Sequence, residues 1–150
     1  MKNKLNKEEI FLVYDKRIIA FFDILGFESM IKKFDVIKIK GILSIPKIYF
    51  ETQSKEKYEN IQISIFSDSI IISFIYTEEQ AVYNLFLDFM NIIIKFIESG
   101  VVCRGFITKG EAIHIENEIF CHGFIDAIKK EKIMNYPRVG FTEEIYQIGT

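Results

Sequence analysis

Hydrophobic and polar positions divide this chain into a succession of predicted strands and helices. Residues 17–23, RIIAFFD, form a compact apolar run of strand length. Further along, IQISIF alternates so that Ile61, Ile63 and Ile65 share one face, and the polar letters SDS separate it from a second apolar run, IIISFIY. Two such runs around a short polar turn predict a hairpin. VVCRGFITKG and RVGF predict further extended segments, and EAIHIENEIF predicts a short strand and a turn.

Helical spacing marks the segments between these strands. Apolar residues recur three or four apart from Phe27 to Phe34, and a second helical piece is expected to run to about Pro46 or somewhat past it. Residues 78–98 form the clearest helix, because their apolar residues make one stripe and Gly100 is a natural stop. GFIDAIKKEKIM predicts a further helix, which the Tyr-Pro pair after it interrupts.

The order of these elements predicts a topology. Strand, helix, strand, strand, helix, strand is the ferredoxin-like βαββαβ arrangement of the α+β class. We expect a single domain over residues 1–150, with residues 1–16 as an N-terminal extension. Right-handed crossovers place the first strand beside the third. Asp23 ends the first strand and Asp68 lies in the hairpin turn, so the fold brings two carboxylates to the same edge.

Composition narrows the setting in which this site would work. Hydrophobic residues make up 49% of the 150 and charged residues 27%, which is typical of a globular domain. The net charge of -2 does not favour nucleic acid as a partner. The most apolar window, LFLDFMNIIIKFI, is too short and too interrupted to span a bilayer, so no membrane partner is expected. Cys103 and Cys121 form no disulfide framework, and a cytoplasmic location is the default.

Two neighbouring carboxylates have a chemical consequence. They repel each other, and a cation between them resolves the repulsion. Oxygen ligands favour magnesium, manganese or calcium, and magnesium often also takes phosphate oxygens from a substrate. Free N–H groups from Leu25 to Phe27, where the chain turns through Gly26 into a helix, are suited to hold phosphate. Taken singly, however, Asp68 also suits a hairpin turn and Asp23 a helix cap.

Other polar residues offer weaker candidates. The spacing of His114 and His122 suits no zinc site, and no His–Asp partnership is evident for Ser67 or Ser69. GFITKG has no Walker spacing, so a P-loop is not expected. The paired aspartates therefore remain the leading candidate site.

Four segments in order resemble one family. FFDILGF resembles the first metal-binding strand of class III nucleotidyl cyclases, FSDSIIIS their second metal-binding hairpin, and CRGFITKGEA their next core strand. The serines around the second aspartate, the RGFITKG strand and the later YPRV look still more like the bacterial Pycsar antiphage cyclases, which make cyclic CMP or cyclic UMP. The resemblance covers about residues 17 to 140 and implies a class III nucleotidyl cyclase core.

This resemblance implies roles for particular residues. Asp23 and Asp68 would bind two Mg²⁺ or Mn²⁺ ions, with the Ile24 carbonyl as a further ligand. The backbone of Leu25, Gly26 and Phe27 would hold phosphate, and Arg104 is a candidate substrate-binding residue. The family works as a head-to-tail homodimer with its sites at the interface.

The chain also departs from the family at several positions. Ser64 stands where purine-specific members carry a base-reading lysine. Ile125 and Lys129 stand where the family has an asparagine and an arginine that steady the transition state. Lys129 supplies charge but not the forked geometry of arginine, and we assign it as a candidate catalytic residue.

These observations lead to one preferred function and two alternatives. The paired aspartates predict a metal-dependent enzyme, and the resemblance implies a cyclase that converts a nucleoside triphosphate, UTP or CTP, to a 3',5'-cyclic nucleotide and pyrophosphate as a signal in antiphage defence. A separate effector protein would detect the product. One alternative is a catalytically degenerate cyclase-like domain that binds nucleotide or only dimerises. The other is a different palm-type nucleotidyl transferase, whose site also uses two carboxylates at a strand edge.

Overall fold

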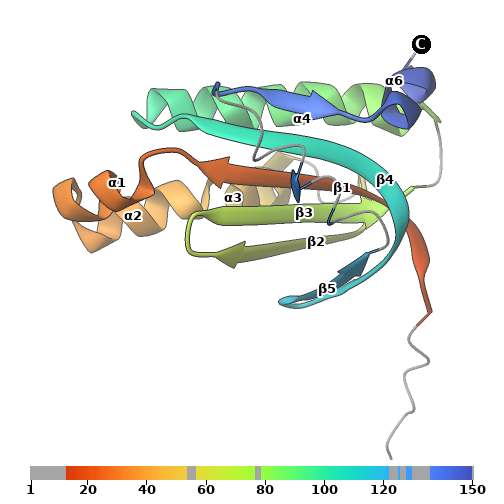
Figure 1. The fold of residues 1–150 in the computed structure, drawn as a ribbon, viewed down its shortest axis with the longest axis horizontal. Coiled ribbons are helices and arrows are strands. Elements are labelled where there is room, and N and C mark those ends of the chain that lie inside the picture. Colours follow the sequence, from red (N-terminus) through yellow and green to blue (C-terminus); the bar gives the residue numbers. More distant parts are fainter. Residues whose placement is uncertain are drawn as a thin grey trace, which may run out of the picture.

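The computed structural model describes residues 13–53, 57–76, 79–121, 125, 128–129 and 136–149. Six strands and five helices are defined there (Figure 1). In chain order they are β1 (Asp15–Ile24), α1 (Phe27–Lys33), α2 (Val36–Leu43), α3 (Ile45–Gln53), β2 (Glu59–Phe66), β3 (Ser69–Ile75), α4 (Glu79–Glu98), β4 (Cys103–Ile115), β5 (Glu118–Cys121), β6 (Val139–Phe141) and α6 (Glu143–Gly149).

The strands form one sheet in the order β2-β3-β1-β4-β5, with β6 also pairing with β4. β1 is central and antiparallel to both β3 and β4, so the predicted placement of the first strand beside the third is confirmed. The ferredoxin-like α+β prediction is confirmed with it. In register, Asp23 of β1 lies between Ser69 of β3 and Arg104 of β4.

One face of the sheet packs against helices and holds the larger core. Alternate residues of β1, including Phe22 and Ile24, join the buried cluster on this face. The Phe22 ring meets the Phe89 ring of α4 edge to face, with centroids 5.4 Å apart. Because side chains alternate along a strand, the neighbouring residue Asp23 points to the opposite face.

The opposite face of the sheet is covered in part by the β4–β5 hairpin. β4 is a long strand that curves at one side of the molecule and returns through β5 (Figure 1). Ile119 and Cys121 of β5 pack against a small buried cluster on this face, made of Ile19, Phe21, Ile71 and Ala112. β4 approaches β1 closely at Gly105, where an added Cβ would lie 2.4 Å from the Phe21 carbonyl oxygen. Glycine is therefore required at that crossing.

The structure refines the predicted helices. The first crossover contains three short helices rather than two, because Asp35 caps α2 by accepting a 2.8 Å hydrogen bond from the Lys38 N–H, and Ser44 separates α2 from α3. Pro46 lies in the first turn of α3, where its missing N–H costs nothing. β1 begins at Asp15, two residues inside the segment predicted as an extension.

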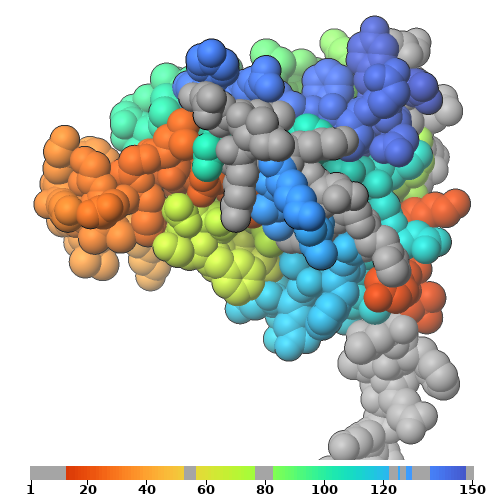
Figure 2. Space-filling model, viewed as in Figure 1, coloured from red at the N-terminus to blue at the C-terminus, as the bar shows by residue number. Residues whose placement is uncertain are grey.

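The later segments follow the prediction only in part, because the two extended segments expected in VVCRGFITKG and EAIHIENEIF join into one continuous strand, β4, and because β5 and α6 were not predicted. α4 ends before Gly100, whose φ of 81° is the left-handed geometry of a helix stop. Of the predicted helix GFIDAIKKEKIM, only residues 125, 128 and 129 lie among those described. In the space-filling view, the α1–α2 segment projects at one end of the molecule and the α6 segment forms a second raised area (Figure 2). Within the described ranges, no helix combines the length and apolar character that crossing a bilayer would require.

Candidate functional site

The two aspartates selected from the sequence lie next to each other. Asp23 is the penultimate residue of β1, and Asp68 lies in the two-residue turn between β2 and β3. The Ile24 N–H donates a 2.9 Å hydrogen bond to the Asp68 carbonyl oxygen, which fixes the turn against the end of β1. The fold therefore brings these two side chains together where β1 ends and the β2–β3 hairpin turns.

Local geometry excludes the simpler explanation for Asp23. The N-cap of α1 is Gly26, at φ 70° and ψ 25°, and no side chain caps that helix. Asp23 instead lies within the β1 ladder, opposite Ser69 and Arg104. Asp68 does occupy a tight turn, in which Ser67 adopts a φ of 56°. The alternative of a helix-capping Asp23 is therefore wrong, whereas Asp68 combines a turn position with its place beside Asp23.

Arg104 contributes a positive charge to this site. Its Nε and Nη2 atoms lie 3.2 and 3.1 Å from Oδ2 of Asp23. The two side chains are 24% and 16% exposed, so solvent screens this ion pair only in part. Arg104 was predicted to bind substrate, and in this structure its guanidinium is held against a predicted metal ligand.

The surroundings of Asp23 disfavour its negative charge. Burial raises the pKa of its carboxyl above the ordinary value of 3.8, and the charge of Asp68 raises it further. The hydrogen bond from Arg104 lowers the pKa but does not cancel these effects. A carboxylate pair with this imbalance gains stability when a further cation binds.

The donor set fits Mg²⁺ or Mn²⁺. Asp23 and Asp68 offer carboxylate oxygens, which are the ligands that these hard cations prefer. Within the described ranges, no group of three or more His, Cys, Asp or Glu side chains could hold a metal ion. Further ligands would therefore have to come from backbone carbonyls, such as the predicted Ile24, or from substrate phosphates, as is common for magnesium.

Fewer backbone N–H groups are available to hold phosphate than the sequence suggested. The Leu25 N–H donates to the Val102 carbonyl oxygen at 2.9 Å, so it is already engaged. Gly26 and Phe27 follow it at the start of α1. A Cβ at Gly26 would meet no atom within 4 Å, so the left-handed backbone, not crowding, favours glycine there. A phosphate role in this segment would rest on the Gly26 and Phe27 N–H groups.

Ser64, which the resemblance aligns with the family's base-reading lysine, belongs to a buried polar chain that the sequence did not reveal. Its Oγ lies 2.7 Å from Nε2 of His114, and His114 Nδ1 lies 2.6 Å from Oγ of Ser73. The Arg17 Nε–H donates to the same Ser73 oxygen at 2.9 Å. Arg17, Ser64, Ser73 and His114 come from β1, β2, β3 and β4 respectively, and each is at most 2% exposed. We call these four residues the serine–histidine chain.

The hydrogen-bond directions in the serine–histidine chain are mutually consistent. The Ser64 hydroxyl donates to the Glu116 carbonyl oxygen at 2.7 Å, so its oxygen accepts from the Nε2–H of His114. Nδ1 of His114 then accepts from the Ser73 hydroxyl. Protonating Nδ1 would remove this acceptor beside a positive charge. Burial, and then the charge of Arg17, accordingly lower the pKa of His114 to about 4.

The other predicted departures lie in a segment that the structure describes only in part. Ile125 is 66% exposed and Lys129 is exposed, and both have helical backbone. Asp126, between them, lies outside the described residues, as does His122. The catalytic role of Lys129 therefore stays a prediction.

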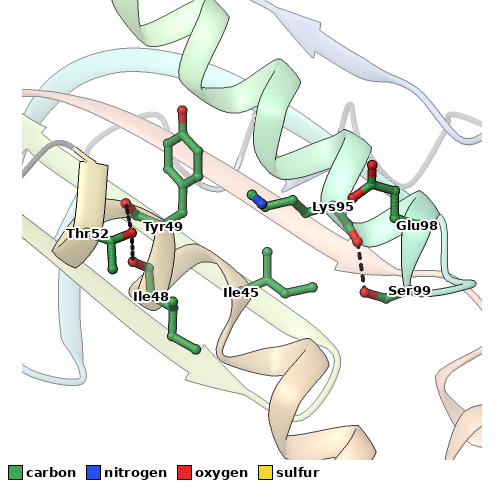
Figure 3. Close-up of a pocket in the computed structure, with 7 residues that line it drawn as sticks. All are labelled: Ile45, Ile48, Tyr49, Thr52, Lys95, Glu98 and Ser99. Atoms are coloured by element: carbon green, nitrogen blue, oxygen red, sulfur yellow. Dashed lines mark hydrogen bonds between the residues drawn. The ribbon is translucent and has the colours of Figure 1, made fainter.

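A separate pocket of about 310 Å³ lies on the helical side of the molecule (Figure 3). It is lined by residues of α3 and α4 together with Ser99, and Lys95 and Glu98 line it at the α4 side. None of its lining residues is Asp23, Asp68 or Arg104. Because Asp23 faces away from the helices, this pocket does not belong to the carboxylate site.

Comparison with solved structures identifies the fold. The adenylyl cyclase CyaB from P. aeruginosa superimposes with a TM-score of 0.62 at 12% identity, covering 89% of this chain and 80% of that one. The guanylate cyclase domain of RhGC from Catenaria anguillulae, solved with GTP, gives 0.64 at 13% identity, covering 90% and 82%. A bacterial light-regulated adenylyl cyclase gives 0.60 at 15% identity, covering 89% and 79%.

These similarities confirm the predicted cyclase fold over nearly the whole chain. No family model matches the sequence. No curated protein matches it either. At identities of 12% to 15%, these superpositions show the fold alone.

Proposed function

We propose that this protein is a metal-dependent nucleotidyl cyclase. It converts a nucleoside triphosphate to a 3',5'-cyclic nucleotide and pyrophosphate. The observation that carries the proposal is the pair Asp23 and Asp68, held side by side where β1 ends and the β2–β3 turn begins. The cyclase fold supports it, because solved adenylyl and guanylyl cyclases share this arrangement of strands and helices.

The residues of this chain have defined roles in the reaction. Bound Mg²⁺ or Mn²⁺ would supply Lewis-acid chemistry, lowering the pKa of the ribose 3'-hydroxyl and balancing triphosphate charge. Asp23 and Asp68 would hold these ions, with the Ile24 carbonyl as a third ligand. The ribose 3'-oxygen attacks the α-phosphorus and forms the new P–O bond. The bond between the α-phosphorus and the pyrophosphate oxygen breaks, and the proton of the 3'-hydroxyl leaves to solvent. The Gly26 and Phe27 N–H groups and Lys129 balance charge on the phosphates.

Ser64 supports a base other than a purine. The resemblance places a base-reading lysine at this position in purine-specific cyclases, and here the Ser64 hydroxyl is engaged by His114 and Glu116. Ser64 therefore cannot make the contact that a lysine at this position would make with a purine base. We infer that the substrate is UTP or CTP, which agrees with the resemblance to the Pycsar cyclases. An antiphage role, a separate effector for the product and a head-to-tail homodimer follow from the same resemblance.

A second candidate function is a degenerate cyclase-like domain. The ion pair between Arg104 and Asp23 favours it, because a fixed guanidinium already neutralises one predicted metal ligand. Ile125 and Lys129, at the places of the family's asparagine and arginine, favour it as well. Such a domain would bind nucleotide or dimerise without forming product.

One experiment separates the two candidates. The purified full chain is incubated with each of the four triphosphates and Mn²⁺, and cyclic product and pyrophosphate are quantified. We expect product from UTP or CTP. Absence of product from all four at high protein concentration, with nucleotide binding retained in calorimetry, would support the degenerate domain instead.

Variants test the site assignment in the same assay. Asp23→Asn and Asp68→Asn should remove activity, whereas Asp35→Asn should leave it unchanged. Asp35 is an exposed carboxylate that caps α2, and asparagine caps a helix equally well. Activity that survives both site substitutions would refute the assignment.

A further inference from the structure

The outer face of α4 carries an unusual row of apolar side chains. Its members are Tyr83, Leu87, Met90, Ile94 and Ile97, which we call the α4 seam, and they are between 43% and 65% exposed. Opposite them on the same helix, Leu85, Phe89, Ile92 and Phe96 are buried in the core. A helix that is apolar on both sides is expected to be covered on both.

The spacing of the α4 seam is that of a helix–helix contact. Its members are separated by four, three, four and three residues, which is the heptad pattern of a coiled-coil interface. The charged residues within this stretch, Asp88 and Lys95, lie off the seam. The seam is about 20 Å long at 1.5 Å per residue, so it presents two full heptads to a partner.

Neighbouring aromatic residues extend this surface beyond the helix. A groove of about 460 Å³ lies beside the seam, where Met90 and Ile93 of α4 face Val139 and Phe141 of β6. Phe141 is 45% exposed, and its ring stacks on that of Tyr146 in α6, which is 53% exposed. The groove therefore connects Met90 of the seam to Phe141 and, through the stacked rings, to Tyr146. In Figure 1, β6 and α6 lie beside α4.

The seam is nearly symmetric about its centre. Tyr83 and Ile97 each lie seven residues from Met90, and Leu87 and Ile94 lie three and four residues from it. In an antiparallel pair of α4 helices related by a two-fold axis, Met90 would meet its own copy and Tyr83 would meet Ile97. A two-fold interface requires this kind of self-complementarity. Antiparallel pairing also sets the two helix dipoles in opposite directions.

We propose that the α4 seam binds a second copy of this chain, with the two α4 helices antiparallel and Met90 on the two-fold axis. The available area agrees with a stable dimer. Half-exposed side chains of this size offer on the order of 100 Å² each, so the seam with Phe141 and Tyr146 offers roughly 700 Å² per copy. Specific interfaces bury about 800 Å² per partner.

This contact is distinct from the homodimer that the resemblance implies. α4 packs on the face of the sheet that carries Phe22, whereas Asp23 points to the opposite face. The proposal therefore does not depend on the proposed function. A chain that uses both surfaces would assemble beyond a dimer, and each contact can be broken without the other.

Cross-linking tests the geometry directly. Under mild oxidation, Met90→Cys should form a disulfide-linked dimer in high yield, because residue 90 faces its own copy. Tyr83→Cys is the matched control, since in this arrangement the two copies of residue 83 lie about 20 Å apart, beyond disulfide reach. The unmodified chain controls for Cys103 and Cys121. Equal linking at both positions, or none at Met90, would overturn the antiparallel pairing.

Particle mass tests the interface independently. We expect Ile94→Glu to halve the mass measured by light scattering across a concentration series, and Lys95→Glu, which introduces the same residue beside the seam, to leave it unchanged. Circular dichroism melting verifies that both variants fold. An unchanged mass for Ile94→Glu would overturn the proposal. So would a wild-type monomer that binds phosphatidylglycerol vesicles through Ile94, because the seam would then contact lipid.

Discussion

Two polar clusters on the same face of the sheet differ in how their charges and hydrogen bonds are satisfied. In the serine–histidine chain, hydrogen bonds run without a gap from Arg17 through the two serines and His114 to the Glu116 carbonyl, and every donor faces an acceptor. At the edge of the sheet, Asp23 and Asp68 are two like charges with one nearby guanidinium, and the pKa of Asp23 is raised. The first cluster is complete by itself, whereas the second would be stabilised by a further cation.

This difference separates residues that hold the fold from residues available for chemistry. A buried network with every partner present contributes stability and a unique geometry. A carboxylate pair with unbalanced charge costs stability in the free protein, and such costs are common at functional sites. Substitutions and a change of pH at the two clusters test this separation.

The largest effect is expected on catalysis. Asp23→Asn and Asp68→Asn should each reduce cyclase activity by at least about 100-fold, because each removes a charged metal ligand. The melting temperature of Asp23→Asn in the absence of metal should stay the same or rise, since the surroundings already favour a neutral group there. Product assays and calorimetry measure the two quantities. A large loss of stability together with the loss of activity would mean that Asp23 is structural and that the two clusters do not differ.

The second prediction concerns the complete cluster. His114→Ala should lower the free energy of unfolding by about 3 kcal/mol, because it leaves the Ser64 and Ser73 hydroxyls without their partner in a buried site. Urea unfolding measures this change. Glu111→Ala, at an exposed position of the same strand, provides the control and should shift stability by less than the uncertainty of the measurement. A His114→Ala variant as stable as the wild type would show that the chain contributes nothing to the fold.

The sequence was sufficient to predict the topology and the carboxylate pair. The apolar run before Asp23 and the alternation before Asp68 are local signals, and the βαββαβ order converts them into neighbouring positions. This works because connection rules restrict which strands can be adjacent. The hairpin turn, the stop at Gly100 and the extended RVGF segment were also predicted correctly, since each depends on residues close in sequence.

The serine–histidine chain could not be predicted in the same way. Its residues are up to 97 positions apart, from Arg17 to His114, and each is unremarkable within its own strand. β2 and β4 are not adjacent in the sheet, so the contact between Ser64 and His114 depends on the curvature of β4. The engagement of the Leu25 N–H by Val102 was missed for a similar reason, because the loop after α4 is placed by tertiary packing.

The third prediction follows from the lowered pKa of His114. The folded protein keeps this imidazole neutral down to about pH 4, whereas the unfolded chain binds a proton near pH 6.5. The unfolded state therefore binds more protons in this window, and stability falls as the pH falls through it. We expect a loss of roughly 2 to 3 kcal/mol between pH 6.5 and 4, measured by urea unfolding. His114→Gln should flatten this part of the profile, and an unchanged slope would remove His114 as its cause.

The smallest expected effect on stability concerns Arg104. Because its ion pair with Asp23 is partly exposed, Arg104→Gln should change the free energy of unfolding by less than about 1 kcal/mol. Its effect on metal should be clearer, since the guanidinium and the cation compete for the same carboxylate. We expect the Mn²⁺ concentration at half-maximal activity to fall several-fold in Arg104→Gln, while Arg104→Lys retains a single positive charge and lies between. A higher KM for the triphosphate with unchanged Mn²⁺ dependence would instead mean that Arg104 binds the nucleotide and does not compete with the metal for Asp23.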